Sequence, residues 1–314
     1  MNCIVTGAAG FIASHLCQRL LKEGFDVVGI DSFSDFYPRW IKEKNIDSLL
    51  KEKNFQFYAE DLNEMDLKKI LKRADYVFHL AAQAGVRTSW GQNFSAYIKN
   101  NIQVTQKLLE AAKEIPLKKF IFASSSSVYG LTPKLPMSET SPLFPLSPYG
   151  VTKLASEQLC FLYFKNYGVP TISLRFFTVY GPGQRPDMAF HKFFKAIQED
   201  KEISVYGDGK QTRDFTYIVD IIEASLGSLA RGKIGETYNI GGGHQEKLED
   251  IFPLLEDTCK KRLRINWAEK QKGDVLHTFA SVEKARKELN YSPRTPLREG
   301  LKEEWKWIQK LYSS

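Results

Sequence analysis

The stretch CIVTGAAGFIA, residues 3–13, decides the fold. A short β-branched run passes through a glycine-rich turn into an amphipathic helix, in which Ile12 and Leu16 repeat at helical spacing and Gly24 marks the expected end. Backbone amides at the start of such a helix face an anion, and the glycines let a pyrophosphate approach. Asp31 closes the second strand about 20 residues later, where an acidic side chain accepts ribose hydroxyls. The segment therefore predicts the first βαβ unit of a dinucleotide-binding domain.

The position of Asp31 also favours one cofactor. A carboxylate there repels a 2′-phosphate, so the sequence predicts NAD rather than NADP. Two further strand ends, at residues 61–62 and 79–83, fit the same crevice, because ligands bind beyond the carboxyl ends of parallel strands. His79 itself reads as a packed structural residue. We expect cofactor contacts from Gly7, Ala9, Gly10, Phe11, Ile12, Asp31, Asp61, Leu62, Leu80, Ala81, Ala82 and Gln83.

Short β-branched or aromatic runs alternate with helical periods along the chain, which predicts βαβ units and a parallel sheet. We expect strands at 3–5, 27–30, 55–58, 76–80, 120–123 and 171–175, and helices at 94–114, 148–166, 218–230, 248–260, 282–289 and 297–311. The glycine- and proline-rich segment 178–214 suits loops over a ligand, whereas 215–240 reads as a helix and a strand that rejoin the sheet.

The predicted fold class is α/β, a Rossmann-type doubly wound parallel sheet with a smaller C-terminal α/β lobe. We assign residues 1–177 plus 215–240 to the NAD-binding domain, and residues 178–214 plus 241–314 to a substrate domain.

Composition argues against several other classes of protein. The chain has 314 residues with 44 Lys and Arg against 37 Asp and Glu, but lysines stand beside glutamates, as at 42–44 and 51–53. That pattern is typical of a solvated surface rather than of nucleic-acid binding, and leaves an anionic small molecule as a partner. With no secretory signal and no apolar run of ~18 residues, we expect a cytoplasmic protein without a membrane partner. Four scattered cysteines indicate neither a disulfide framework nor a metal site.

Tyr149 and Lys153 form the predicted catalytic centre. They are spaced i, i+4 on a helix that Ser147 and Pro148 would start, so both side chains leave one face. A phenol with an unperturbed pKa of about 10 is a poor base at neutral pH, and a nearby ammonium lowers that pKa. A run of four serines, 124–127, ends the fifth strand and could link a substrate oxygen to the tyrosine. The arrangement predicts proton abstraction from an alcohol.

In this order the motifs resemble those of the extended short-chain dehydrogenase/reductase superfamily, the NAD-dependent nucleotide-sugar epimerases and dehydratases. The resemblance runs through TGAAGFIA, HLAAQAGVR, SSSSVYG, SPYGVTK, LRFFTVYGP, YGDGKQTRDFTY and QKGDV, over essentially the whole chain. It implies that Tyr149 is the base, that Lys153 binds the nicotinamide ribose and tunes Tyr149, and that Ser125 hydrogen-bonds the reacting oxygen, with Ser124 and Tyr149 also beside the cofactor. Ala13 replaces the usual third glycine, and we expect NAD binding to survive. The resemblance also suggests a homodimer through helices 94–114 and 148–166.

Two serines argue against dehydration. Related dehydratases carry an Asp-Glu pair where this chain has Ser126 and Ser127, and uronate decarboxylases carry a Glu at position 127. Eliminating water needs a general acid and a general base, which neutral hydroxyls replace poorly. The resemblance therefore implies C4 epimerisation, in which a 4-keto sugar turns over in the pocket and receives the hydride on its opposite face.

The expected sugar is indicated by Thr178, where UDP-glucose 4-epimerases usually have Asn. The segments 176–182 and 185–188, and Gln271 ahead of GDV, look like those of UDP-glucuronic acid 4-epimerases. Thr178, Ser126 and Ser127 offer neutral donors to a sugar carboxylate. We hypothesise that they hold it out of the alignment in which a 4-keto uronic acid loses CO₂. The predicted reaction is UDP-glucuronic acid to UDP-galacturonic acid.

Charge predicts the remaining substrate contacts. The planar fork of arginine suits phosphate oxygens, which points to Arg185 and Arg213 for the UDP diphosphate and to Arg87 as a further candidate. Asp274 could bind the uridine ribose, and Tyr206 could border the uracil.

Other functions stay open at this point. The first alternative is a UDP-glucose/UDP-galactose 4-epimerase, and the second is a UDP-glucuronate decarboxylase. A classical short-chain dehydrogenase would lack the 178–214 segment. A non-enzymatic NAD-binding regulator would be expected to have lost Tyr149 or Lys153, and the chain has both.

Overall fold

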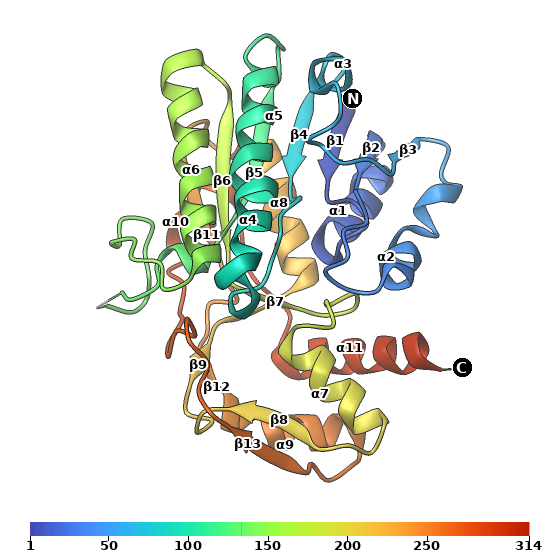
Figure 1. Cartoon of the computed structure of the whole chain (residues 1–314), viewed down its shortest axis with the longest axis vertical. Coiled ribbons are helices and arrows are strands. Elements are labelled where there is room, and N and C mark those ends of the chain that lie inside the picture. The colour runs from blue at the N-terminus through green and yellow to red at the C-terminus, as the bar shows by residue number, and fades with distance from the viewer. Residues whose placement is uncertain (133, 314) are drawn as a thin grey trace.

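A seven-stranded parallel sheet forms the centre of the molecule in the computed structural model, which describes residues 1–132 and 134–313. The strand order is β11-β6-β5-β4-β1-β2-β3, and each neighbouring pair runs parallel (Figure 1). The strands are β1 Asn2–Thr6, β2 Asp26–Ile30, β3 Phe55–Tyr58, β4 Tyr76–His79, β5 Lys119–Ser125, β6 Thr171–Phe176 and β11 Thr237–Ile240. The α/β fold class and the return of the chain to the sheet after residue 215 are therefore confirmed.

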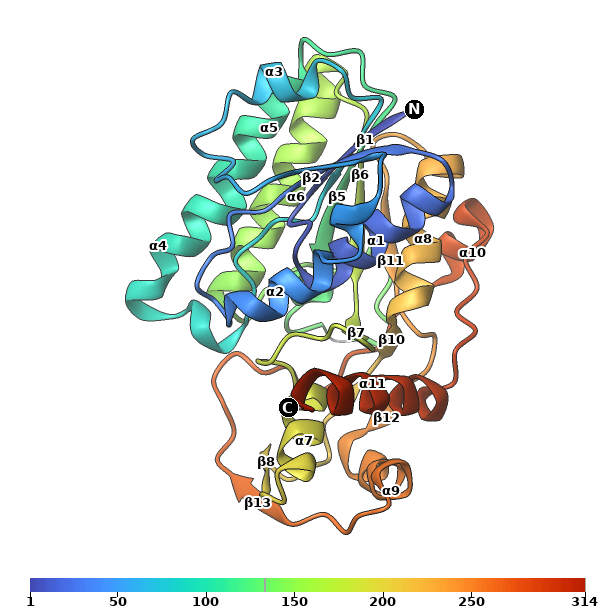
Figure 2. The same ribbon diagram turned by 90° about the vertical axis from the view of Figure 1, so that its right-hand side faces the viewer.

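Helices cover both faces of this sheet (Figure 2). One layer contains α1 Phe11–Lys22, α8 Ile218–Arg231 and α10 Glu283–Leu289. The opposite layer contains α3 Leu67–Leu71, α5 Val104–Ala112 and α6 Pro148–Tyr167. Each layer buries its own apolar cluster against the sheet, as expected for strands that are hydrophobic on both faces.

The turn after β1 shows why this stretch needs glycine. Gly7 has a φ of +73°, and a Cβ there would lie 2.9 Å from the backbone of Ala81 on the loop after β4. Its N–H also donates to the carbonyl of Ile30 at 2.7 Å. The first turn is thereby packed against the ends of two neighbouring strands.

One predicted helix, residues 94–114, is interrupted. The structure has α4 Phe94–Tyr97, then a π-helical segment, η4 Ile98–Gln103, and then α5. The reason is Asn101, whose buried side chain accepts from the N–H of Gln83 and donates to the carbonyl of Gln83 and the hydroxyl of Thr152. The wider turn directs this side chain toward the sheet, a common use of π-helical turns near functional sites.

The segment predicted as loops, 178–214, is more regular than expected. It contains β7 Thr178–Tyr180, α7 Ala189–Gln198, β8 Ile203–Tyr206 and β9 Thr212–Arg213. The aromatic sequence of α7 buries Phe190, Phe193 and Phe194 in a third core with α9 Leu248–Cys259 and α11 Leu297–Tyr312. Helix α7 was not predicted because it is short and because glycines and prolines on both sides of it are typical of loops.

The elements around this third core form a second lobe, the lower lobe in Figure 1. The remaining elements belong to this lobe or to the connections. In the lobe, β10 Phe215–Tyr217 pairs with β7, β12 Glu246–Lys247 with β9 and β13 Ile265–Ala268 with β8. Elements elsewhere are α2 Arg39–Ile46, η1 Leu49–Lys51, η2 Arg87–Ser89, η3 Gly91–Asn93 and η5 Ser126–Val128. Positions 133 and 314, which fall in the predicted ranges 1–177 and 241–314, lie outside the described residues. Within the described part of the chain, no helix has the length and apolar content needed to cross a membrane.

Candidate active site

A cavity of about 600 Å³ lies at the carboxyl ends of the parallel strands, between the sheet and the lower lobe. Its wall includes the turn after β1, the serines after β5, the first half of α6 and the segment after β7. All of the predicted site residues line it except Ala9, which is fully buried. The topology thus brings together side chains that lie as far apart in sequence as Gly7 and Asp274.

The dinucleotide end of the cavity is formed by the start of α1 and the end of β2. Helix α1 begins after Gly10 with no side-chain cap, so its N-terminus is suited to a pyrophosphate. Asp31 accepts hydrogen bonds from the N–H groups of Ala9 at 3.1 Å and Phe33 at 2.8 Å, while burial raises its pKa. Ala9 therefore contributes its backbone to holding Asp31. These residues fit NAD.

Residues 42–44 were expected on a solvated surface, which is wrong for Lys42, because it lies on helix α2, an element that was not predicted, and its side chain is buried. This buried lysine lines the cavity near Asp31, and its ammonium donates to the carbonyl of Ser34 at 2.8 Å. Burial lowers the pKa of Lys42, and the carboxylate of Asp31 opposes that shift. The two charges partly compensate each other.

Tyr149 and Lys153 leave one face of α6, as predicted. Ser147 caps the helix by accepting from the N–H of Gly150 at 3.1 Å, and Pro148 occupies the first turn. The ammonium of Lys153 donates to the carbonyl of Ala123 at 2.7 Å, and burial lowers its pKa to about 8. Both side chains thus face the end of β5.

The environment of Tyr149 differs in one respect from the expectation. Burial raises the pKa of its phenol, and the two main opposing influences are the positive charge of Arg185 and the neighbouring hydroxyl of Ser125. The cation that lowers the Tyr149 pKa in this structure is therefore Arg185, whereas Lys153 points to the backbone of β5.

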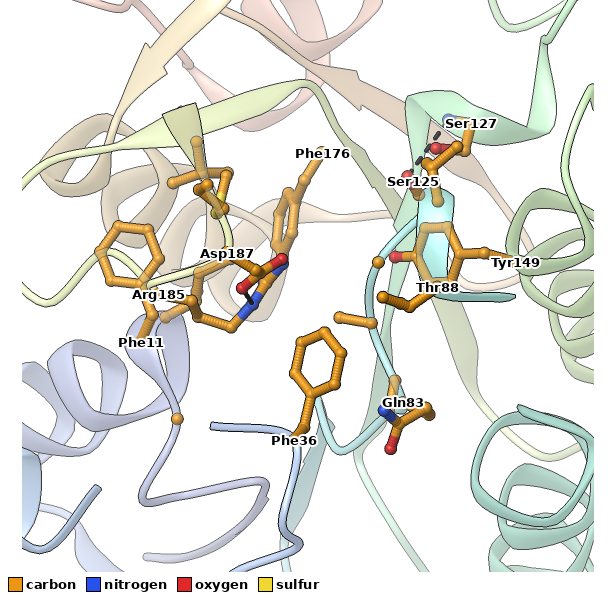
Figure 3. A pocket seen from close by; sticks show the side chains of 18 of the residues that line it. Phe11, Phe36, Gln83, Thr88, Ser125, Ser127, Tyr149, Phe176, Arg185 and Asp187 are labelled. Atoms are coloured by element: carbon orange, nitrogen blue, oxygen red, sulfur yellow. Dashed lines mark hydrogen bonds and ion pairs between the residues drawn. The ribbon is translucent and has the colours of Figure 1, made fainter. Parts of the chain in front are cut away.

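Arg185 faces Tyr149 across the cavity as half of an ion pair (Figure 3). Its Nε lies 2.9 Å from Asp187 Oδ1, and its Nη2 lies 3.0 Å from Asp187 Oδ2. Burial raises the pKa of Asp187, but the arginine outweighs that effect and the pKa is lowered overall. The sequence analysis did not select Asp187, although its position two residues after Arg185 was a usable signal.

The serine run ends β5 and starts η5. Ser125 Oγ accepts from the N–H of Ser127 at 3.1 Å and so caps the short helix. Ser126, Ser127 and Thr178 also line the cavity, and Figure 3 shows Ser125 and Ser127 beside Tyr149. Ser124 differs, because its hydroxyl donates to the buried carboxylate of Glu157 at 2.6 Å.

A second group of charged side chains, Arg87, Arg213 and Asp274, lines the part of the cavity nearest the lower lobe. Arg87 lies over the ring of Tyr206, 4.2 Å from its centroid, and its Nη2 lies 2.7 Å from Asp274 Oδ2. Arg213 lies close enough to both charges to respond to them, and its Nη1 donates to the carbonyls of Thr212 and Leu276. Arg185 was predicted with Arg213 at one diphosphate, and in this structure the charge that acts most on it is that of Asp187.

His79 is a packed residue, as the sequence analysis expected. It is fully buried, with Nδ1 2.8 Å from Thr6 Oγ1 and Nε2 3.0 Å from Thr105 Oγ1, and burial lowers its pKa to about 3. Among residues 1–132 and 134–313, no cluster of His, Cys, Asp and Glu is arranged to hold a metal ion.

Known proteins resemble this chain along its whole length. A crystal structure of UDP-glucuronic acid 4-epimerase from Bacillus cereus, in complex with UDP-glucuronic acid and NAD, is 50% identical with a TM-score of 0.97, covering 99% of this chain and 100% of that one. An uncharacterized UDP-glucose epimerase of Bacillus subtilis is 46% identical, covering 99% of both chains. A UDP-glucuronate 4-epimerase of Thermodesulfobacterium geofontis is 41% identical, covering 97% of this chain and 95% of the relative.

A family model describes the same relationship independently. The model of the NAD dependent epimerase/dehydratase family matches residues 3–241, which include nearly all of the parallel sheet and the helix α6 that carries Tyr149 and Lys153. The motifs, the sheet order and the cavity agree with this match, and the chain belongs to the NAD dependent epimerase/dehydratase family.

Proposed function

We propose that this protein is an NAD-dependent 4-epimerase of UDP-sugars that converts UDP-glucuronic acid to UDP-galacturonic acid. The observation that carries the proposal is the cavity in which Tyr149, Lys153 and Ser125 meet at the end of β5. The Bacillus cereus enzyme, with UDP-glucuronic acid and NAD bound, supports the substrate and the cofactor at 50% identity. We assign residues 1–177 plus 215–240 to NAD, and 178–214 plus 241–314 to the UDP-sugar.

The chemistry assigned to the chain is proton transfer at the C4 oxygen of the sugar. Bound NAD supplies a reversible hydride acceptor. Tyr149 takes the proton of the C4 hydroxyl, and Ser125 donates a hydrogen bond to the same oxygen. Lys153 is held by the carbonyl of Ala123 and would bind the nicotinamide ribose, and Arg185 opposes the rise that burial causes in the pKa of Tyr149. After the sugar has turned over, the same tyrosine returns the proton.

The carboxylate of the sugar is the feature that separates this substrate from UDP-glucose. We assign its recognition to Ser126, Ser127 and Thr178, which line the cavity and carry no charge. Hydroxyl donors can hold the carboxylate away from the geometry in which the C–C bond to it lines up with the 4-keto group. That constraint would suppress loss of CO₂ from the 4-keto uronic acid.

The direct test is to incubate the purified protein with NAD and either UDP-glucuronic acid or UDP-glucose, and to follow the products by NMR. UDP-galacturonic acid as the product of the first substrate supports the proposal. UDP-pentose would indicate decarboxylation, and turnover of UDP-glucose alone would refute the assignment of the uronate. Tyr149→Phe should abolish turnover, and retained activity would contradict the role of the base.

A UDP-glucose 4-epimerase is the second candidate. One observation favours it, namely the 46% identity to a relative from Bacillus subtilis that bears that name. The same NMR assay separates the two substrates, because both are offered to the same preparation.

We also propose a homodimer. Helix α6 exposes Val151, Phe161 and Leu162 with about half of each side chain in contact with solvent, and Ile98 of η4 is similarly exposed. Exposed apolar groups on adjacent helices are typical of a protein interface. The proposed cellular location is the cytoplasm, supported by four cysteines that are all free; fractionation of producing cells would test it.

A further inference from the structure

Helix α6 carries a third residue in line with Tyr149 and Lys153. Glu157 follows Lys153 by four positions, and one face of the helix therefore presents all three to the end of β5. Tyr149 lies beside Ser125 (Figure 3), Lys153 donates to the carbonyl of Ala123, and Glu157 accepts from the hydroxyl of Ser124 at 2.6 Å. Three consecutive residues of β5 are thus contacted by three successive turns of α6.

Glu157 is also bound to the neighbouring strand. Arg175 of β6, the direct register partner of Ser124, donates from Nε to Glu157 Oε2 at 3.1 Å and from Nη2 to Oε1. Its Nη1 donates to the hydroxyl of Tyr129 at 2.8 Å, and that hydroxyl donates to Asn239 of β11. One buried carboxylate therefore joins the catalytic helix to β5 and β6.

The contribution of the Glu157–Arg175 ion pair to stability does not by itself explain its presence. Both side chains are 5% exposed, and buried pairs of this kind often add little net stability compared with apolar residues of similar size. Because its hydrogen bonds have a preferred direction, an ion pair fixes the position of a helix over a sheet. Apolar packing fixes that position less tightly. Proton transfer is sensitive to such positions, because a misplacement of about 1 Å can cost up to about 100-fold in rate.

We propose that Glu157, held by Arg175, is a positioning residue for the reaction: through Ser124 it fixes α6 on β5 so that the Tyr149 phenol stays beside the Ser125 hydroxyl. This inference rests on the proposed function and deepens it. The Ser124 hydroxyl then serves the helix rather than the cofactor.

The test is Ser124→Ala, which removes the link to α6 and leaves the Glu157–Arg175 pair intact. Ser124→Thr keeps the hydroxyl. The matched control is Thr171→Val, which removes another buried hydrogen bond of α6, from Thr171 Oγ1 to the carbonyl of Cys160 in the C-terminal half of the helix. For each protein, kcat and KM with UDP-glucuronic acid, the melting temperature and the amount of bound NAD are measured.

We expect Ser124→Ala to lower kcat about tenfold with KM within about twofold of wild type, as for a small misplacement of the reacting groups. Its melting temperature and bound NAD should match those of Thr171→Val, whose kcat stays at the wild-type value. Ser124→Thr should restore kcat. Two results would overturn the proposal. One is loss of bound NAD in Ser124→Ala, and the other is an equal loss of kcat in Ser124→Ala and Thr171→Val.

A second measurement is independent of the substrate. The titration of the Tyr149 phenol is read from its ultraviolet absorbance, as the difference between each protein and the same protein with Tyr149→Phe. Ser124→Ala should raise the Tyr149 pKa by about one unit, because the Ser125 hydroxyl beside the phenol would no longer be held in place to stabilise the phenolate. An unchanged pKa contradicts the inference. If the wild type converts no UDP-sugar, the proposed function fails while this titration still decides the role of Ser124 and Glu157.

Discussion

Arg185 and Tyr149 are the two residues that we expect to set the pH dependence of the activity. A buried phenol resists ionisation, and the guanidinium across the cavity partly offsets that effect. Asp187 holds the guanidinium with two hydrogen bonds, so its direction is fixed before a substrate arrives. The expected consequence is that activity rises with pH as Tyr149 ionises.

The first prediction concerns Arg185→Met combined with Asp187→Asn. Removing the positive charge raises the Tyr149 pKa, so less phenolate is present at a given pH and the rising limb of kcat moves to higher pH by about one unit. Rate profiles from pH 6 to 10 measure the shift. Arg262→Gln, at an exposed position, is the control and should leave the profile unchanged. A profile that stays in place in the double variant would show that Arg185 does not tune Tyr149.

At the scale of elements, two segments hold the loops that form the cavity. The π-helical turn η4 ties the loop after β4 to α6 through Asn101, and α11 supports the turn after β7 through Glu304. Both contacts use a buried polar side chain. Each one therefore gives a variant whose effect differs from that of an ordinary surface change.

We expect Asn101→Ala to destabilise the protein by about 1 to 3 kcal/mol, because the N–H and C=O of Gln83 and the hydroxyl of Thr152 lose their partner. The loop of Gln83 borders the predicted cofactor contacts, so bound NAD should decrease as well. Urea unfolding and the NAD content after gel filtration measure the two effects. The exposed Gln103 of the same π-helical turn provides the control, Gln103→Ala. Equal stability of the two variants would contradict the assigned role of Asn101.

Glu304 gives a stability prediction with a definite sign. Its Oε2 accepts from the N–H of Gly181 at 2.7 Å, no hydrogen-bond partner for Oε1 is found among the described residues, and burial raises its pKa well above the ordinary value. As pH rises above the pKa of glutamate in the unfolded chain, the unfolded state loses its proton while the folded state keeps one. The contribution to stability is present at low pH and declines as pH rises, by about 1.4 kcal/mol per unit.

Glu304→Gln should remove that decline. Relative to wild type, the free energy of unfolding of this variant should therefore improve between pH 5 and pH 8, as measured by urea titrations at each pH. Glu303→Gln, an exposed neighbour on α11, should follow the wild type. A constant difference between Glu304→Gln and wild type over this range would mean that Glu304 is ionised in the folded protein.

At the scale of the whole molecule, the two-lobed arrangement leaves one side of α6 without cover. Phe161 and Leu162 are 48% and 50% exposed on the outer face of the catalytic helix. Covering this face with a second copy would remove apolar surface from water and would also support the helix that carries Tyr149.

We therefore expect the double variant Phe161→Asp and Leu162→Asp to change the molar mass from that of a dimer to that of a monomer, as measured by light scattering after gel filtration. Buried charges at an apolar interface are costly, which gives the direction. Trp267→Asp alters an equally exposed aromatic group on the lower lobe and should leave the mass unchanged. A wild type that already elutes as a monomer would refute the dimer.

The sequence alone determined the parallel sheet, the glycine turn at the start of α1, and the shared helix face from which Tyr149 and Lys153 project. These features depend on local spacing: glycines between a strand and a helix, an acid after the second strand, and two side chains one helical turn apart. The same spacing also contains Glu157, four residues further on. Helix α7 and the π-helical turn were not found, because tertiary packing of Phe190 and hydrogen bonds of Asn101 override the local pattern.

Only the tertiary structure decided which distant charges act on one another. It placed Arg185 opposite Tyr149, joined Arg87 to Asp274, and brought Ser124 into hydrogen-bond contact with Glu157. Electrostatic interactions depend on distance and burial, and neither can be read from separations of 33 to 187 residues along the chain. The motifs therefore predicted the reacting groups, whereas the fold fixed the positions of these side chains and the surroundings that shift the pKa values of Tyr149 and Lys153.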